Sequence, residues 1–458
     1  MSADSASAAT ASPIPHALAA GWWSSVPPYS FILHLTYTVI SSNARTLSFD
    51  RLTPSSPSPI YGEGIDRKGG DQMLRKGKIY TLLTLTLIDT KDGIRFTKRD
   101  MEVREIFGKV FAGERISRDE GLSLLKNADT IHMGSLADSV RRKHHPEGIV
   151  TFVADTNPNY TNVCDTECLF CAFWRPAGAH DAYTHSVDKV IEMMRASYHN
   201  GATTVLLQGG HNPDITLDYY IEIIKRTRKE IPGLHLHAFS APEISAIAKY
   251  SDLTTEEVLR RFWEAGLRTI PGGGAEVLSN RVRKKISPLK IDADQWMKVT
   301  REAHLTGFKT TATMMFGHFE EDEDILEHLD RIRTLQDETG NFLAFIPWTF
   351  KPKNTFLERK LPNETGGDRY LRVLALSRIY LDNFVHVQGS WFTQGAKIGS
   401  LSMHYGASDL GGTLYDENVL CCAENRLRST VDELVHMIKS AGFVPAQRDT
   451  YYRILNQF

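Results

Sequence analysis

The sequence predicts an α/β protein built as a TIM-type (β/α) barrel, and three observations support the barrel. Candidate strands and amphipathic helices alternate from Gly148 onward, in six to eight units. This alternation is typical of parallel strands joined by right-handed helical crossovers. Polar and glycine-rich clusters directly follow the strands, at the end where barrels carry their active sites. No G-x-G-x-x-G sequence opens the first crossover, which disfavours a flat dinucleotide-binding sheet.

Composition divides the chain into four segments. Residues 1–100 are rich in Ala, Ser, Pro and Thr, and we expect a low-complexity, poorly ordered N-terminal extension there. Residues 101–148 are expected to form a helical lead-in to the barrel. Residues 149–384 are expected to form the barrel core, including the loop that carries three of the cysteines, and residues 385–458 the last barrel units and a cap.

The expected strands are short, and the helices between them have recognisable ends. The strands are expected at 157–163, 203–208, 234–239, 267–271, 308–313, 342–347, 385–391 and 409–413. Ser186 precedes the apolar series of one helix, and Gly201 follows it. Thr254 and Glu257 form a capping-box pattern at the start of another helix, and Gly266 marks its end.

The charge balance argues against two classes of partner. Lys and Arg number 53 against 55 Asp and Glu, so no global field indicates nucleic acid or an anionic membrane. No run approaches the ~20 apolar residues of a membrane span. Residues 1–20 contain no Lys or Arg, which a secretory signal would carry. We therefore expect a cytoplasmic protein.

Three of the five cysteines lie close together, at C-x3-C-x2-C spacing: Cys164, Cys168 and Cys171. Three thiolates on one loop can bind three irons of a [4Fe–4S] cluster and leave the fourth iron open. An open iron can bind the amino and carboxylate groups of S-adenosylmethionine, and reductive cleavage then gives a 5′-deoxyadenosyl radical. The main alternative is a zinc site completed by His180 or His185, but no second ligand pair follows at the usual spacing.

At this loop the chain resembles the radical S-adenosylmethionine (SAM) superfamily. From residue 159 to residue 412 it is similar to the futalosine-pathway enzymes of menaquinone biosynthesis, through the blocks "NYTNVC", "LLQGG-NPD", "LHLHAFS-PEI", "IPGGGAE", "TTATMMFGH", "LQDETG-F-AFIPWTF", "LDN" and "GASDLGGT". The blocks "PGGGAEV", "FIPWTF" and "WFTQG" favour the cyclic dehypoxanthinyl futalosine synthases within that group. Aminofutalosine synthases and the deazaflavin (coenzyme F420) synthase subunit share much of the pattern.

The resemblance implies an enzyme that cyclises dehypoxanthine futalosine. The adenosyl radical would take a hydrogen atom from ribose C4′, the carbon radical would add to the benzoate ring, and loss of a proton and an electron would restore aromaticity. It also implies a reducing partner such as flavodoxin or ferredoxin. The alternatives are an aminofutalosine synthase, a deazaflavin synthase-type enzyme or a non-catalytic iron–sulfur or zinc scaffold. Glycine-rich and polar turns follow successive strands at one end of the barrel. A scaffold has no need of such ligand-binding turns, so this pattern disfavours the scaffold.

The resemblance also implies positions for the cofactor. Three residues of one turn stand where the superfamily binds the methionine amino group: Gln208, Gly209 and Gly210. Glycines at a strand end let the backbone approach a ligand, and an ordinary β–α turn is the alternative. Phe173 matches the position whose backbone contacts adenine. Ser240 and Glu243 could hold the ribose or carboxylate of the cofactor, with a helix-start role for Glu243 as the alternative.

The substrate residues are expected at later strand ends. Glu276 follows three glycines and is expected to hydrogen-bond a sugar hydroxyl. Asp409 or His318 is nominated as the base that takes the ring proton, although a lone histidine is often a satisfied structural group. Four further residues are expected to contact the substrate or shape its pocket: His237, Gln394, Trp348 and Thr349.

Overall fold

The computed structural model describes residues 97–458. The N-terminal extension expected at residues 1–100 therefore lies, apart from residues 97–100, outside the described part of the chain. Three helices precede the barrel: α2 (Lys98–Ala112), α3 (Arg118–Asn127) and α4 (Thr130–His144). Thr97 caps α2 with a reciprocal side-chain and backbone capping box, and Gly113 ends it in the left-handed conformation at φ 82°.

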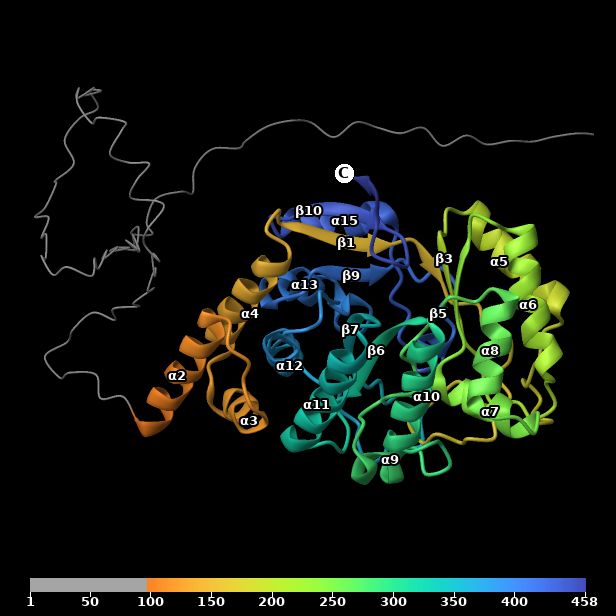
Figure 1. Cartoon of the computed structure of the whole chain (residues 1–458), viewed down its shortest axis with the longest axis horizontal. Helices are drawn as coiled ribbons and strands as arrows, with labels where there is room; N and C mark the ends of the chain where they lie inside the picture. Colours follow the sequence, from red (N-terminus) through yellow and green to blue (C-terminus); the bar gives the residue numbers. More distant parts are fainter. Residues whose placement is uncertain (1–96) are drawn as a thin grey trace, which may run out of the picture. The chain divides into compact units, whose positions relative to one another are not determined.

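The strands lie in the middle of the barrel with helices outside them (Figure 1). They are β1 (Ile149–Val153), β2 (Asp155–Thr156), β3 (Thr204–Leu207), β4 (His235–Ala238), β5 (Thr269–Ile270), β6 (Lys309–Phe316), β7 (Phe342–Thr349), β8 (His386–Val387) and β9 (Asp409–Gly412). Strands β2 to β8 make one sheet in sequence order, and all of its pairs are parallel. A parallel bridge from Gln388 to Asp409 and the β1–β9 pair close the ring. The predicted barrel is thus confirmed.

The first expected strand, 157–163, is wrong. The barrel begins instead at β1, whose apolar residues are buried except at the first position. Pro158 has no backbone N–H to contribute to a sheet ladder. The segment leaves the barrel and makes only isolated bridges, from Thr161 to Thr184 and from Val163 to Arg175. It thereby carries the cysteines out to the mouth.

Helices cover the outside of the ring, as the expected alternation requires. They are α5 (Val187–His199), α6 (Leu217–Glu230), α7 (Ala241–Tyr250), α8 (Thr255–Ala265), α9 (Asn280–Ile286), α10 (Ala293–Thr306), α11 (Asp322–Thr339), α12 (Gly367–Tyr380) and α13 (Trp391–Ser402). The helix expected to start at Thr254 begins there, and Gly266 ends it at φ 109°. Val258, Leu259 and Phe262 of α8 are fully buried against the core. Burial of such a side chain stabilises the fold by about 1.5–3 kcal/mol.

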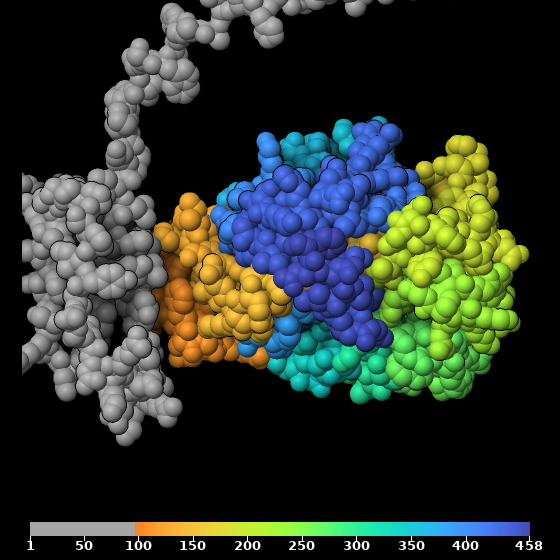
Figure 2. Space-filling view, turned by 90° about the horizontal axis from the view of Figure 1, so that it is seen from above, coloured from red at the N-terminus to blue at the C-terminus, as the bar shows by residue number. Residues whose placement is uncertain are grey.

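The C-terminal segment adds elements that the sequence reading did not foresee. After β9 come α14 (Val419–Cys422), α15 (Val431–Ser440), β10 (Val444–Arg448) and β11 (Ile454–Gln457). Strand β10 pairs in parallel with β1, and β11 pairs antiparallel with β10. Figure 2 shows these last residues, dark blue, on the surface beside the gold segment that contains β1. Among the described residues, no helix is both long and apolar enough to cross a membrane.

Candidate active site

The barrel encloses a cavity of about 260 Å³. Alternate residues of each strand face it, because side chains alternate between the two faces of a sheet. The strands contribute Val153, Asp155, Thr204, Leu206, His237, Thr311, Thr313, Ile346 and Trp348, and the segments that follow strands add Asn157, Gln208, Glu276, Gln388, Glu417 and others. The cavity therefore opens among the residues that follow the strands, as expected for a barrel enzyme.

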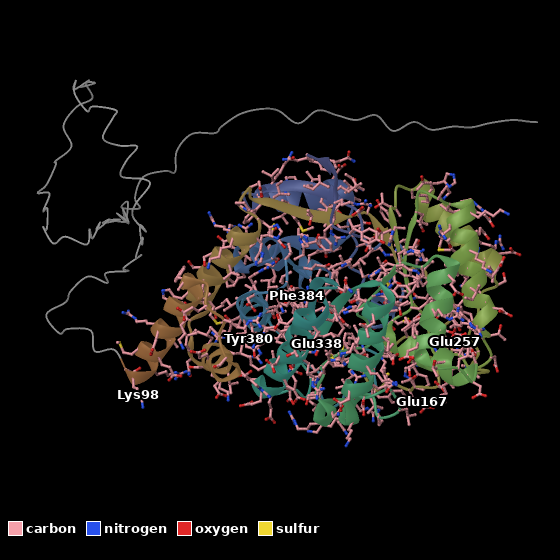
Figure 3. The ribbon with its side chains drawn as sticks, viewed as in Figure 1. Lys98, Glu167, Glu257, Glu338, Tyr380 and Phe384 are labelled. Carbon is pink, nitrogen blue, oxygen red and sulfur yellow. The ribbon has the colours of Figure 1, made fainter. Side chains whose placement is uncertain are left out.

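The cysteine loop lies beside this cavity, held by the ends of two helices. Figure 3 labels Glu167 in this loop, between α7 and α9. The backbone N–H of Leu169 donates to the carbonyl of Ile286 at the end of α9, at 2.9 Å. The Tyr250 hydroxyl at the end of α7 donates to the Asp165 carboxylate. The loop is thus held at two points between Cys164 and Cys171.

The donor set of this loop fits an iron–sulfur cluster. Cys164, Cys168 and Cys171 are all free thiols. Burial raises the pKa of the Cys171 thiol, and the backbone N–H groups of Phe173 and Trp174 oppose that rise, as hydrogen-bond donors around cluster thiolates do. Within residues 97–458 no three Cys, His, Asp or Glu side chains already stand in a metal-binding arrangement. The fit therefore rests on the number, spacing and surroundings of the thiols.

A buried cation accompanies these thiols. Burial raises the pKa of the Cys168 thiol to about 12, and the Lys290 ammonium opposes that rise. Lys290 also lies 5.5 Å from the ring centroid of Phe170 and donates to Glu276 Oε1 at 2.8 Å. Because metal ligation requires thiolates, a cation at this place favours the ligating form.

The glycine turn after β3 owes its composition to the cysteine loop. A Cβ on Gly209 would lie 2.6 Å from the ring of Tyr160, and one on Gly210 would lie 2.1 Å from the carbonyl oxygen of Val163. Side chains here would displace the loop that carries Cys164. Gln208 lines the cavity, whereas the two glycines pack behind it.

Ser240 and Glu243 start helix α7 in a capping box. Glu243 accepts hydrogen bonds from the backbone and hydroxyl of Ser240, from the Tyr160 hydroxyl and from the Gly209 N–H, at 2.6–3.0 Å. Burial raises its pKa, against these four donors. Neither residue lines the cavity. The geometry supports the helix-start alternative, in which Glu243 fixes the glycine turn.

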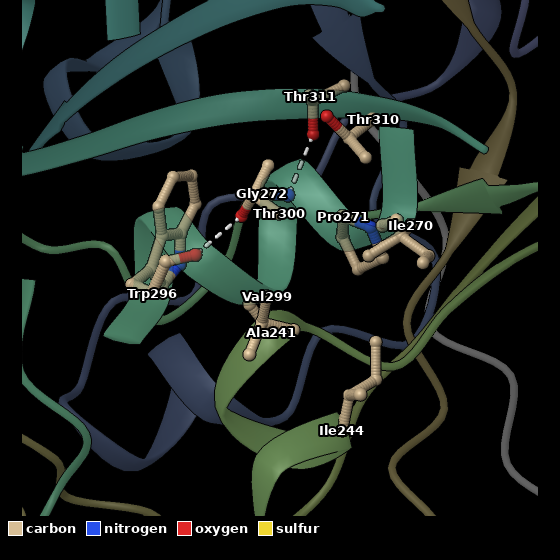
Figure 4. A pocket seen from close by; sticks show the side chains of 11 residues that line it. Ala241, Ile244, Ile270, Pro271, Gly272, Trp296, Val299, Thr300, Thr310 and Thr311 are labelled. Carbon is tan, nitrogen blue, oxygen red and sulfur yellow. Dashed lines mark hydrogen bonds between the residues drawn. The ribbon is translucent and has the colours of Figure 1, made fainter. Parts of the chain in front are cut away.

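The glycine-rich turn after β5 places Glu276 in the cavity. The Gly272 N–H donates to the Thr311 hydroxyl at 2.9 Å, and a Cβ on Gly272 would lie 2.4 Å from the Thr311 carbonyl oxygen (Figure 4). Arg283 of the basic α9 segment is buried and donates to the carbonyls of Gly274 and Ala275. Glu276 is 5 % exposed, and its Oε2 lies 3.7 Å from Arg283 with no hydrogen-bond partner.

Two expected bases lie outside the cavity lining. Asp409 is fully buried and bound by Arg448 and by the Thr151 hydroxyl at 2.6 Å. The His318 side chain is buried, with Nε2 3.0 Å from the Met315 carbonyl and Nδ1 2.9 Å from Glu320 Oε2. The structure therefore shows both side chains satisfied by the protein itself.

The remaining expected substrate residues divide in two groups. His237 and Trp348 line the cavity. Burial lowers the pKa of His237 to about 3, and its Nδ1 lies 2.9 Å from the Thr269 hydroxyl. Gln394 donates to the Thr349 hydroxyl at 2.7 Å, so this pair is brought together, but neither lines the cavity.

The cavity contains polar residues that the sequence reading missed: Asp155, Asn157, Glu417 and Arg448. Asp155 and Asn157 immediately precede the cysteine loop, in a segment assigned in part to a strand. Arg448 ends a strand that was not expected. A search for charged residues at the end of every apolar run, including "FVPAQR", would have found Arg448.

Comparisons with known proteins place this site in a family. A model of the radical SAM superfamily matches residues 159–332, and a model described as the CofH/MqnC C-terminal region matches residues 339–457. A cyclic dehypoxanthine futalosine synthase from Halalkalibacterium halodurans is 40 % identical, over 78 % of this chain and 96 % of the relative. The chain belongs to the radical SAM superfamily of enzymes.

The chain is also similar to proteins of other names. An aminodeoxyfutalosine synthase from Thermus thermophilus is 38 % identical, over 78 % of this chain and 96 % of that protein. Among solved structures, methylornithine synthase matches with a TM-score of 0.59 at 17 % identity, over 74 % of this chain and 97 % of that one. HydG, a hydrogenase maturase, matches with a TM-score of 0.61 at 15 % identity, over 76 % and 75 %. These two structures support the fold alone.

Proposed function

We propose that this radical SAM enzyme cyclises dehypoxanthine futalosine to its cyclic form in menaquinone biosynthesis. The observation that carries the proposal is that the sequence blocks typical of the cyclases converge on one cavity. Glu276 comes from "PGGGAEV", Trp348 from "FIPWTF", and Gly411 and Gly412 from "GASDLGGT". The Halalkalibacterium relative of that name supports the same reaction.

The roles of the residues follow from their places. When bound by Cys164, Cys168 and Cys171, a [4Fe–4S] cluster together with S-adenosylmethionine would supply the adenosyl radical. Gln208 lines the cavity directly before the glycine turn that packs against the cysteine loop, so its side chain can orient the cofactor. Glu276 offers a carboxylate to a sugar hydroxyl.

Part of the cavity wall is apolar. The wall is formed by Leu206 of β3, Ile346 and Trp348 of β7, and Phe392 of α13. Such a wall can hold an aromatic ring against the sugar and exclude water from a reactive carbon radical. Hydrogen donors that would quench the radical are thereby kept away.

The test is anaerobic turnover with three substrate sets. The reconstituted, reduced enzyme receives S-adenosylmethionine and dehypoxanthine futalosine, and mass spectrometry follows the products. A product lighter by one hydrogen molecule, with 5′-deoxyadenosine and methionine, supports the cyclase.

The competing reactions give different products. An aminofutalosine synthase would consume S-adenosylmethionine and a substrate alkene. It would join the adenosyl radical to the alkene and retain the adenosyl group in its product. The transferase named for a Methanopyrus kandleri relative, 39 % identical, would consume 5-amino-6-(D-ribitylamino)uracil and tyrosine. Turnover of either of these sets, with dehypoxanthine futalosine unchanged, would overturn the proposal.

A further inference from the structure

In the described part of the chain, two carboxylates of the cavity keep an oxygen without a hydrogen-bond partner: Glu276, which is paired with Lys290, and Asp155, which has no such ion pair. Asp155 of β2 is 8 % exposed and lines the cavity. Its Oδ1 accepts a hydrogen bond from the Leu414 N–H at 2.9 Å. Within residues 97–458, Oδ2 has no hydrogen-bond partner, and protein atoms do not enclose it completely. Oδ2 is therefore free to meet a substrate.

The turn after β9 is built around this carboxylate. A Cβ on Gly412 would lie 2.0 Å from Asp155 Oδ1 and 2.2 Å from Oδ2. The Thr413 hydroxyl bonds both the N–H and the carbonyl of Asp155, at 3.0 and 2.9 Å. The two glycines of "GASDLGGT" thus let the backbone approach the acid.

The other acids near the cavity have both oxygens engaged or are paired with cations. Glu417 accepts from the Leu420 N–H at 2.9 Å and from the Asn157 amide at 2.7 Å. Glu276 is paired with Lys290, and Asp409 with Arg448. Proton transfer requires an unoccupied oxygen within reach of the substrate, and Asp155 has one.

The charges around Asp155 adjust its basicity. Burial raises its pKa to about 6, the negative charges of Glu417 and Asp409 act in the same direction, and the Leu414 N–H and the Arg448 guanidinium oppose them. A base works best when its pKa lies near the operating pH. His237, the other open base of the cavity, has a pKa lowered to about 3 by burial and is a weaker acceptor.

We propose that Asp155 is the catalytic residue that accepts the ring proton in the last step of cyclisation. This inference rests on the proposed function. The carbon radical has by then bonded to the ring, which carries one hydrogen and one electron too many. The ring C–H bond breaks, its proton goes to Asp155 Oδ2, and its electron goes to a one-electron acceptor of the oxidised iron–sulfur class.

The test uses Asp155→Asn in the full chain with substrate deuterated at C4′. Asn keeps an oxygen for the Leu414 N–H, so cluster content and thermal stability should match wild type. Deuterium should still appear in 5′-deoxyadenosine, while cyclic product falls on the order of a hundredfold. A substrate-derived radical should accumulate in freeze-quench electron paramagnetic resonance spectra.

The dependence of turnover on pH gives a second, independent test. Wild-type turnover should fall as pH drops through about 6, because protonated Asp155 cannot accept a proton. Glu417→Gln removes a negative charge that raises the pKa of Asp155, so this acid limb should move to lower pH. That shift tests the inference even if Asp155→Asn fails to fold.

Three outcomes would overturn the assignment. If Asp155→Asn cyclises the substrate at the wild-type rate and with the same loss of rate at low pH, Asp155 is not the proton acceptor. The proposed function then still stands. If turnover no longer falls at low pH in His237→Asn, but still falls in Asp155→Asn, His237 is the acceptor. Failure of the wild type itself to cyclise the substrate overturns the proposed function, and the proton-acceptor role with it.

Discussion

The Arg448 guanidinium binds the Asp409 carboxylate through two hydrogen bonds, from Nε to Oδ2 at 2.5 Å and from Nη2 to Oδ1 at 3.0 Å. Both side chains are buried, with exposures of 7 % and 0 %. The pair joins β10 to β9 on either side of β1. It therefore connects the C-terminal segment to the closure of the barrel.

Breaking this pair should destabilise the protein strongly. Removing one partner of a buried ion pair leaves an uncompensated charge, so Asp409→Asn should lower the free energy of unfolding by about 3–5 kcal/mol. Urea unfolding measures the loss. Glu338→Gln, in the half-exposed pair with Arg301, is the control and should cost about 0–1 kcal/mol. A stable Asp409→Asn that no longer cyclises would instead make Asp409 the base.

Gly412→Ala should be destabilising because the added methyl group has no room. The new Cβ would lie 2.0 Å from the Asp155 carboxylate, and such overpacking costs about 1–3 kcal/mol. Gly108→Ala is the matched control, because Gly108 lies in α2 with nothing within 4 Å of its Cβ position. Alanine in a helix interior should stabilise by about 0.5–1 kcal/mol. Melting temperatures that move equally in both variants would contradict the close approach.

The sequence predicted the barrel because each unit carries its own local signals. The strands that became β3, β4, β6 and β7 are apolar runs between readable helix ends, such as Gly266 after α8. Residues 157–163 were misread because extended backbone has the same composition inside and outside a sheet. Strand β10 was missed because its pairing with β1 joins residues about 300 positions apart, and no local pattern records such contacts.

The candidate site was predicted unevenly for a related reason. The cysteines are set by spacing along one loop. Glu276 follows β5 and Trp348 lies near the end of β7, so the direction of these strands places both at the cavity. Asp409 and Asp155 could not be ranked from sequence, because the difference between them is an arginine from β10. Its guanidinium binds Asp409 and leaves one oxygen of Asp155 open.

Acid should destabilise the fold through its buried histidines, among them His304, whose pKa burial lowers to about 3. Burial lowers the pKa of His211, His237 and His328 to about 3, whereas the unfolded chain titrates near 6.5. Between those values the unfolded state binds more protons, so stability falls as pH drops below about 6.5. Each histidine should contribute about 2 kcal/mol of this loss at pH 5.

Unfolding curves from pH 7 to pH 5 test the histidines one at a time. His328→Asn keeps an acceptor for the Leu278 N–H, which His328 Nδ1 receives at 3.0 Å, and should reduce the loss of stability between pH 7 and pH 5 by about 2 kcal/mol. His180→Asn, whose side chain is 96 % exposed, should leave the slope unchanged. An equal slope in wild type and His328→Asn would mean that His328 titrates normally in the folded protein.

Lys290→Met should lower the reduction potential of the bound cluster. The Lys290 ammonium interacts electrostatically with Cys168 and is only 12 % exposed, so its charge is poorly screened and favours the reduced, more negative cluster. Methionine keeps much of the apolar stem and removes the charge. Lys284→Met makes the same charge change on an exposed face of α9 and should leave the potential near the wild-type value. Spectroelectrochemical titration of the reconstituted proteins measures both, and equal potentials in the two variants would exclude Lys290 as an electrostatic partner of the cluster.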